Sequence, residues 1–544
     1  MKYKFTLLIM LLFVSCNSSE QEDLKKTINI SIKSDDLIIK NIQKITNINI
    51  DFKSSLKDSY ILFTNKSNIK TDISINIKGE KKDSTQKISK RTLNCSINPA
   101  LHASQYISDF NHMPIKSSST KNTLKNIIEK NNKAKEELFY LNKNPSNPTK
   151  VSIKKITQNI KTKYGNKKLN IWVSNDAFGN NCSKSYCITQ NMVDILADNF
   201  LKAGEDNDIY DWVTNIFGEE WGESNNSLLI DKNDEITILL TDIDNDDKSN
   251  GVVLGYFYAK DNYKKSIYPG SNERTMFYID SVVFASYQDN EPWNIEGSKQ
   301  KKILSTLAHE FEHMIQFYQK KVRYTNDNLQ PWIDEMLAVT IEDLIATKLE
   351  TNGIRGVSYT RGDAGEEKNQ NGKFPLFNKN INITLPSWNN KREDYSKVGA
   401  FGSYLIRNYG GAKLLHDILH NPYKDERAIT YAVKKALNGS NKSFETIMHD
   451  WGIAVLLSSS TNIDIDSGYL YNFGDFLNVP YKESLYNMGS INFFNYKNLP
   501  NLSSNIKTIE PKSNLYYKIG ENLTGDIKIM IETNPNILAT LIIK

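Results

Sequence analysis

Two histidines and two glutamates lie within one five-residue string, His309-Glu310-Phe311-Glu312-His313. On a helix, side chains four residues apart lie about 40° apart around the axis, so both imidazoles can bind one zinc ion. Glu310 would stand beside them, where a carboxylate can take a proton from a zinc-activated water. The string therefore predicts a hydrolytic metal site on a helix, with an exposed polar helix face as the alternative.

The residues around this string have the spacing of an amphipathic helix. No glycine or proline occurs between Ser298 and Lys321, and the apolar residues of this segment fall on one stripe. His309 and His313 lie on the opposite side of the predicted helix, with Glu310 at its edge. The chain holds only 7 histidines, which weakens the alternative of an ordinary polar face.

A third ligand from the protein must come from another segment, because a catalytic zinc ion keeps its fourth position open. Pro331 and Trp332 open a second predicted helix, to about Leu349, and Glu335 would lie in its first turn. We predict Glu335 as the third ligand, with the adjacent Asp334 as the alternative. A third interpretation is an acid stabilised by the helix dipole. The string Trp-x-x-Glu-x-x-Ala resembles the third-ligand segment of the gluzincin metallopeptidases.

A hydrolase of this kind also needs a donor for the oxyanion of its tetrahedral intermediate. The string Tyr395-Ser-Lys-Val-Gly399 is similar to the tyrosine-bearing segment that follows the zinc site in several gluzincins, with one extra residue before the glycine. Tyr395 is the predicted donor, and a structural role for it is the alternative, since the chain has 28 tyrosines. His416 and His420 are rival donors.

The zinc string and the region upstream of it resemble the hyicolysin-like neutral metalloproteases, peptidase family M30, and the zinc string is the most specific part of the resemblance. The resemblance covers about residues 165–460. Upstream of the zinc string it includes two predicted strands (169–173 and 236–243), two predicted helices (192–203 and 209–217) and the strings Gly255-Tyr-Phe and Ser271-Asn-Glu. It implies that a strand near Tyr278–Phe284 borders the cleft and holds an extended peptide. The chain lacks the Gly-x-Met-Glu-Asn string with which aminopeptidase gluzincins hold a free amino terminus. The resemblance therefore implies an endopeptidase acting on polypeptides.

The amino terminus has the pattern of a lipoprotein export signal. Lys2 and Lys4 precede an apolar core of about ten residues, too short to span a bilayer. Phe13-Val-Ser-Cys16 resembles a relaxed lipobox, which implies cleavage before Cys16 and its acylation. The alternative is a plain secretory signal. We therefore expect an exported bacterial lipoprotein held at a membrane by lipid.

The remaining cysteines and one acidic loop suggest further features. An exported protein can form disulfides, so Cys182 and Cys187 could close a small loop and leave Cys95 over. The segment Asp242–Asp247 resembles the start of a calcium loop but lacks its glycine and its final glutamate. A solvated acidic loop is favoured there over a Ca²⁺ site. The net charge of +5 is slight, which argues against nucleic acid as a partner.

The length of 544 residues favours two or three domains in an α+β chain. The pattern predicts six segments: a signal peptide (1–16), a tether (17–26), an amino-terminal β-rich domain (27–105), a linker with one helix at 124–141 (106–150), a metallopeptidase domain (151–465) and a carboxy-terminal β-rich domain (466–544). The metallopeptidase domain would combine a mixed sheet with a mainly helical lower half, and the β-rich domains would be sandwich-like.

These observations together predict a lipid-anchored zinc endopeptidase, in which His309, His313 and Glu335 hold one Zn²⁺ and Glu310 is the base. The main alternative is a non-catalytic surface binding protein or adhesin on a peptidase scaffold, against which the intact Glu310 argues. The second alternative is an aminopeptidase.

Overall fold

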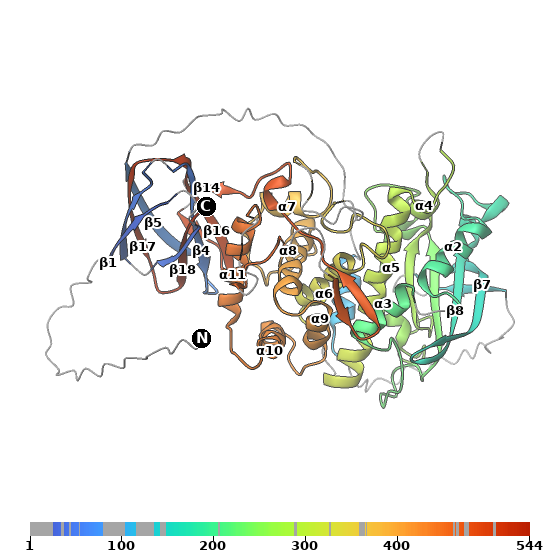
Figure 1. The fold of residues 1–544 in the computed structure, drawn as a ribbon. Helices are drawn as coiled ribbons and strands as arrows, with labels where there is room; N and C mark the ends of the chain where they lie inside the picture. Colours follow the sequence, from blue (N-terminus) through green and yellow to red (C-terminus); the bar gives the residue numbers. More distant parts are fainter. Residues whose placement is uncertain are drawn as a thin grey trace, which may run out of the picture.

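The computed structural model places α-helices and β-sheets in separate parts of one α+β molecule (Figure 1). It describes residues 26–33, 37–42, 45–53, 55–79, 104–115, 135–141, 148–204, 207–287, 291–325, 328–357, 365, 367–460, 463, 467–472, 478–503 and 507–544. Cys16 and Cys95 lie outside these residues. In Figure 1 a mixed sheet, a helical region and a β-sandwich follow one another across the molecule.

The mixed sheet has six strands in the order β10-β11-β9-β8-β7-β6. Their bounds are Glu136–Phe139 (β6), Thr149–Thr162 (β7), Gly165–Ser174 (β8), Glu235–Thr241 (β9), Gly255–Phe257 (β10) and Met276–Asp280 (β11). Strands β8, β9 and β11 run parallel, and β10 pairs antiparallel with β11. The central strands are buried, as expected for parallel strands covered on both faces.

Two predictions about this sheet are wrong. The segment Tyr278–Phe284 does not form the border strand, because β11 lies between β9 and β10 and residues 281–285 form a short helix. The edge strand is β10, whose three residues are too few to show a strand pattern. The helix predicted at 124–141 is also contradicted where the structure describes it, since β6 pairs there with β7.

The first group of helices consists of α2 (Gln190–Phe200), α3 (Ile209–Phe217), α4 (Ser281–Ala285) and α5 (Ser298–Gln316). Of these, α5 carries the first half of the candidate site, the string His309–His313. Helix α5 continues into a π-helical segment, η5 (Phe317–Thr325). Short 3₁₀ turns complete this part of the chain: η1 (Asn175–Ala177), η2 (Gly179–Asn181), η3 (Ile243–Asn245) and η4 (Ala259–Asn262).

The helical region carries the second half. It contains α6 (Pro331–Leu344), α7 (Phe374–Lys379), α8 (Arg392–Asn408), α9 (Ala412–Leu419), α10 (Glu426–Ala436) and α11 (Phe444–Leu457). Pro331 stands at the start of α6, where the missing N–H of proline costs no helical hydrogen bond. One continuous hydrophobic core joins these helices to the mixed sheet, so the two halves hold each other in place.

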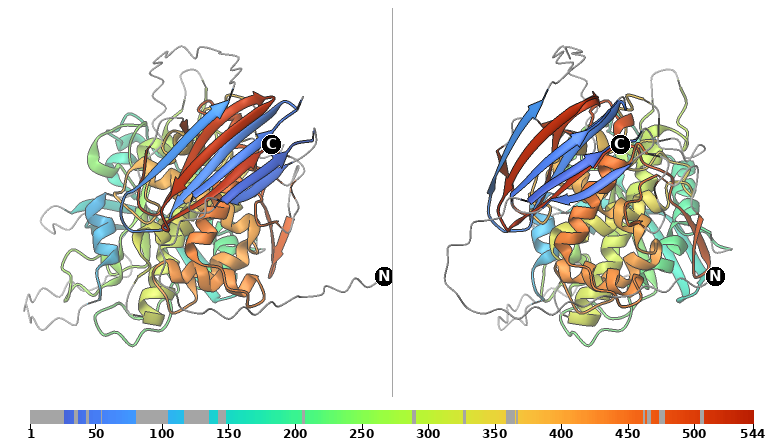
Figure 2. Two further views of the ribbon diagram at one scale, coloured as in Figure 1. Left: turned by 90° about the vertical axis from the view of Figure 1, so that its left-hand side faces the viewer. Right: turned by 60° about the vertical axis from the view of Figure 1, so that its left-hand side comes forward.

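The two ends of the chain build a single β-sandwich, although the sequence predicts two separate β-rich domains. One sheet has the order β1-β3-β17-β5-β15 and the other β14-β16-β4-β18-β2. The strands are Lys26–Ser31 (β1), Ile38–Ile42 (β2), Ile45–Asp51 (β3), Lys57–Asn65 (β4), Thr71–Gly79 (β5), Leu502–Ser503 (β14), Thr508–Ile509 (β15), Ser513–Leu523 (β16), Asp526–Thr533 (β17) and Ile537–Ile543 (β18). The blue and red strands alternate in Figure 2. Of the edge strands, β15 pairs with β5 and β2 pairs with β18, so each obtains its partner from the other end of the chain.

Three smaller elements complete the fold. The hairpin β12 (Asn478–Tyr481) and β13 (Ser484–Asn487) and the turn η7 (Phe493–Asn495) follow the helical region. Helix α1 (Gln105–His112) comes from the segment between the sandwich and the mixed sheet and lies against the latter's domain (Figure 2, light blue). Among the described helices, none combines the length and the apolar run that crossing a bilayer requires.

Candidate metal centre

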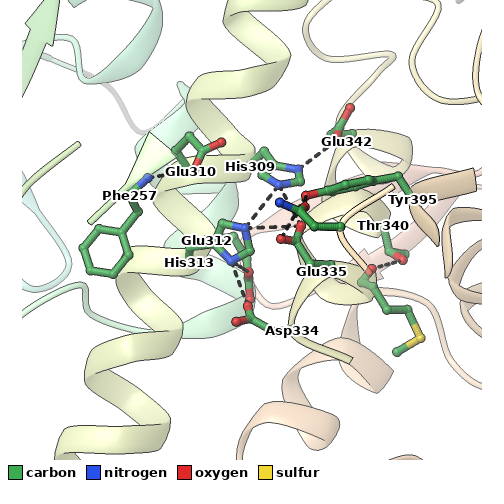
Figure 3. Close-up of polar contacts among 12 residues, drawn as sticks. Phe257, His309, Glu310, Glu312, His313, Asp334, Glu335, Thr340, Glu342 and Tyr395 are labelled. Carbon is green, nitrogen blue, oxygen red and sulfur yellow. Dashed lines mark hydrogen bonds and ion pairs between the residues drawn. The ribbon is translucent and has the colours of Figure 1, made fainter. Parts of the chain in front are cut away.

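Three side chains from two consecutive helices point their ligand atoms at one another (Figure 3). His309 and His313 come from α5, and Glu335 comes from the first half of α6. The two Nε2 atoms lie 3.2 Å apart, and Glu335 Oε2 lies 3.3 Å from Nε2 of His309 and 3.6 Å from Nε2 of His313. The structure thus brings together the three residues that the sequence predicts as metal ligands.

This geometry fits a tetrahedral zinc ion. Ligand atoms at the usual zinc distances of about 2.0–2.2 Å lie about 3.3–3.6 Å from one another in a tetrahedron, close to the separations found here. Burial disfavours the charged form of each group, but attraction outweighs it: the facing Glu335 and Glu342 raise the pKa of His309 to about 9, and the imidazoles lower the pKa of Glu335 to about 2. A field that favours positive charge on these rings also favours a cation between them.

A carboxylate orients each imidazole from behind. His309 Nδ1 donates to Glu342 Oε1 at 2.8 Å, and His313 Nδ1 donates to Asp334 Oδ1 at 2.8 Å. Both rings are therefore held in the tautomer that leaves Nε2 for a metal ion. Asp334, the alternative third ligand, contacts the opposite nitrogen of His313, so it does not complete the group around the two Nε2 atoms.

Glu310 lies on α5 beside the edge of the mixed sheet (Figure 3). Its Oε2 accepts a hydrogen bond from the Phe257 main-chain N–H of β10 at 2.9 Å. Burial raises the pKa of Glu310, although the nearby imidazoles of His309 and His313 act in the opposite direction. A carboxylate with a raised pKa holds a proton more readily, as a base that must accept one and release it requires.

Tyr395 reaches the same place from α8. Its hydroxyl lies 3.2 Å from Glu335 Oε1 and 2.7 Å from Asn390 Oδ1. Burial and the Glu335 carboxylate hold the pKa of Tyr395 well above its ordinary value, so the hydroxyl keeps its proton and stays a donor. The predicted tyrosine donor therefore adjoins the predicted third ligand.

Comparison with known proteins identifies the domain that carries this site. The family model described as peptidase M30 matches residues 150–472, which is more than half of the chain. The chain belongs to the peptidase M30 family. The neutral metalloprotease ShpI of Staphylococcus hyicus is 25% identical over 309 residues, which cover 56% of this chain and 60% of ShpI. The chain thus matches about three fifths of the length of that curated relative.

The rival histidines of the M30 domain face elsewhere. His416 Nδ1 lies 2.8 Å from the Ile216 carbonyl oxygen, and His420 Nε2 lies 2.9 Å from that of Phe217. Both rings therefore bind carbonyls of the last turn of α3, which have no hydrogen-bond donor within that helix. This arrangement is structural and does not bring either ring to the metal centre.

A lysine from the segment after β8 binds the acidic loop Asp242–Asp247 of the M30 domain. Lys184 Nζ lies 2.8 Å from Asp242 Oδ2 and 2.7 Å from Asn245 Oδ1, so its ammonium group balances the carboxylates. Cys182 and Cys187 form a disulfide that closes the short loop containing Lys184, with their Cα atoms 5.9 Å apart. The disulfide and the lysine together connect the end of β8 to the loop after β9.

Sequence reasoning missed three groups of this site: the Glu342 carboxylate, the Phe257 N–H and His112. Glu342 had a signal, because it follows Glu335 by seven residues, two helical turns, and therefore lies on the same face of α6. Phe257 contributes through its main chain, which no residue type reveals. His112 comes from α1, and its Nε2 lies 2.7 Å from Asp334 Oδ2.

Proposed function

We propose that this M30 protein is a zinc-dependent endopeptidase. The observation that carries the proposal is the mutual separation of three ligand atoms, 3.2, 3.3 and 3.6 Å, with a carboxylate behind each imidazole. His309, His313 and Glu335 would hold the ion. Bound Zn²⁺ would supply Lewis-acid polarisation of a water molecule and of the scissile carbonyl.

The protein's own groups then move the proton and hold the substrate. Glu310 accepts the proton of the attacking water and passes it to the leaving amine, and its raised pKa suits both steps. Tyr395 donates from its neutral hydroxyl to the developing oxyanion. The edge strand β10 offers main-chain groups to an extended polypeptide, which favours cleavage within a chain.

The test is hydrolysis of casein by the purified protein with and without a chelator. We expect cleavage that is lost on chelation and restored by Zn²⁺. Glu310→Gln should reduce the rate of cleavage by a factor on the order of 1,000 or more, because it removes the catalytic base. Tyr395→Phe should lower kcat by about 10²-fold with unchanged zinc content. Equal cleavage of amino-terminally blocked and free peptides supports an endopeptidase, whereas loss of cleavage on blocking indicates an aminopeptidase. A protein loaded with zinc that cleaves neither would contradict the proposal.

We further propose that Cys16 is acylated and that the lipid holds the protein at a bacterial membrane. The basis is the short apolar run followed by Phe13-Val-Ser-Cys16. Labelled palmitate should enter the wild-type chain and not Cys16→Ala, and only the wild type should sediment with membranes. Sedimentation of Cys16→Ala with membranes would contradict a lipid anchor.

A further inference from the structure

Helix α1 spans the cleft in which the metal centre lies. It belongs to the segment before the M30 domain, yet its last turn contacts both the edge strand β10 and the helices that carry the ligands. An eight-residue helix is marginal in isolation, so its packing against the domain must supply most of its stability.

Asn111 of α1 binds the main chain of the sheet edge. Its Nδ2 donates to the Phe257 carbonyl at 2.9 Å, and its Oδ1 accepts from the Ala259 N–H at 2.8 Å. The N–H of Phe257 is bound by Glu310 and not by β11, so this side of β10 faces away from its neighbouring strand. The Asn111 amide therefore makes the donor and acceptor bonds that the N–H and the C=O of one residue of an extended substrate would make.

The same end of α1 is held on the opposite wall. His112 Nε2 lies 2.7 Å from Oδ2 of Asp334, the carboxylate that orients His313. The Asn111 carbonyl accepts from Lys321 Nζ of η5 at 2.9 Å. Contacts on both walls show that α1 bridges the cleft, with Asn111 and His112 between β10 and the start of α6.

Aromatic packing anchors the remainder of the helix. The Phe110 ring lies 5.2 Å from Tyr258, 5.9 Å from Tyr263 and 5.1 Å from Tyr268, in edge-to-face arrangements. Ile107 is 2% exposed in the small core beneath β10. Edge-to-face aromatic pairs stabilise packing beyond the burial of their surface, and three of them hold this short helix in place.

Little space remains between α1 and the catalytic groups. The cavity there has a volume of about 20 Å³, room for one or two water molecules. Its lining includes residues of α1, of β10 and of the metal centre: Ser108, Asn111, His112, Phe257, Glu310 and Glu335. A polypeptide cannot enter while α1 is in this position.

We propose that α1 is an autoinhibitory element that occupies the substrate-binding edge of this chain's own active site. The inference rests on the proposed peptidase function, because it assigns a regulation to that site. Release of α1 frees the Phe257 carbonyl and the Ala259 N–H for a substrate backbone. Phe110 and Asn111 carry the blocking contacts, and neither belongs to the catalytic machinery.

The test compares full-length zinc-loaded proteins on an internally quenched peptide. Phe110→Ala/Asn111→Ala removes the anchor and the substrate-like amide. Asn111→Asp is nearly isosteric and removes only the donor to Phe257. The matched control is Gln105→Ala/Asp109→Ala, which removes an exposed hydrogen bond of the same helix. We expect at least tenfold faster hydrolysis from both cleft variants, no change from the control, and inhibition of the double variant by a peptide of residues 104–115.

A second readout needs no turnover. In a Glu310→Gln background, a fluorescent extended peptide should bind at least tenfold more tightly when Phe110→Ala/Asn111→Ala is present. Tighter binding without hydrolysis by any Glu310-containing variant would overturn the peptidase function and leave the autoinhibition standing. Unchanged binding would overturn the autoinhibition, whether or not the protein hydrolyses peptides. If the double variant does not fold, hydrolysis and peptide binding measured with Asn111→Asp decide.

Discussion

At the scale of single residues, the metal centre contains more buried carboxylates than imidazoles, so negative groups are in excess. The carboxylates of Glu310, Asp334, Glu335 and Glu342 surround two imidazoles and have little exposed surface. Buried charges that lack compensation destabilise a fold by several kcal/mol. A divalent cation at the two Nε2 atoms and Glu335 balances much of this charge. Metal binding should therefore stabilise the M30 domain as well as activate it.

The first prediction concerns Glu342, which orients His309. Glu342→Ala should weaken zinc binding about 10- to 100-fold, because the His309 ring loses the acceptor that fixes its tautomer. Glu342→Gln retains an acceptor and should lose less. Competition with a chromophoric chelator measures the affinity.

Ser305→Ala is the matched control, because it removes only the weaker 3.4 Å bond to the other oxygen of Glu342. Its zinc affinity should stay near that of the wild type. Unchanged affinity in Glu342→Ala would show that the ring is held by packing alone.

At the scale of elements, the sequence predicts what local spacing determines. His309 and His313 share a face because they lie one helical turn apart, and Glu335 is recognisable near the start of a second helix. The edge strand β10 is not predictable in this way, since three residues show no alternation. His112 and Asp334 are 222 residues apart in the sequence (334 − 112), so no local pattern predicts their contact.

The crossing of α6 and α8 determines how closely Tyr395 approaches Glu335. A Cβ on Gly402 would overlap the Thr340 hydroxyl of α6 and lie 3.2 Å from Met336 Cγ. Gly402→Ala should therefore separate the two helices, destabilise the protein by about 1–3 kcal/mol and reduce kcat. Urea denaturation and peptide hydrolysis measure the two effects.

Adding Thr340→Ala to Gly402→Ala removes the overlapping hydroxyl and should restore part of both losses. Thr340→Ala alone is the matched control, since it removes only the bond of Thr340 to the Met336 carbonyl. A Gly402→Ala protein with wild-type stability and kcat would contradict the close packing of α6 and α8.

At the scale of the whole molecule, the two chain ends meet in one sandwich that is docked on α11. Alternating apolar residues predict the strands at both ends, yet the period of two says nothing about which strands pair. Strand β17 pairs with β3 and β5, and β18 pairs with β2 and β4. The M30 domain is therefore inserted between the two groups of strands that form the sandwich, and these strands can pair only after the domain between them has been synthesised.

His449 of α11 joins the helix to this sandwich and predicts a pH dependence. Its Nδ1 lies 2.8 Å from Thr64 Oγ1 of β4, and its Nε2 lies 2.7 Å from Thr540 Oγ1 of β18. Burial lowers the pKa of His449 from 6.5 to about 4, because the charged ring has no carboxylate beside it. Between pH 6.5 and about pH 4, the His449 ring therefore binds a proton in the unfolded chain but not in the folded chain. Stability is complete above pH 6.5 and falls by up to about 3 kcal/mol as the pH drops to about 4.

Urea denaturation across this window separates His449 from the other titrating groups when the wild type is compared with His449→Gln. The amide of glutamine can still bond to Thr64 but takes up no proton. The variant should be less stable than the wild type at neutral pH and should lose less stability on acidification. Parallel stability curves for the two proteins would show that the ring has the same pKa in the folded and the unfolded chain, and would contradict the prediction. A wild type that gains stability relative to His449→Gln on acidification would show that the folded ring keeps its proton, held between two hydroxyl groups that both accept from it.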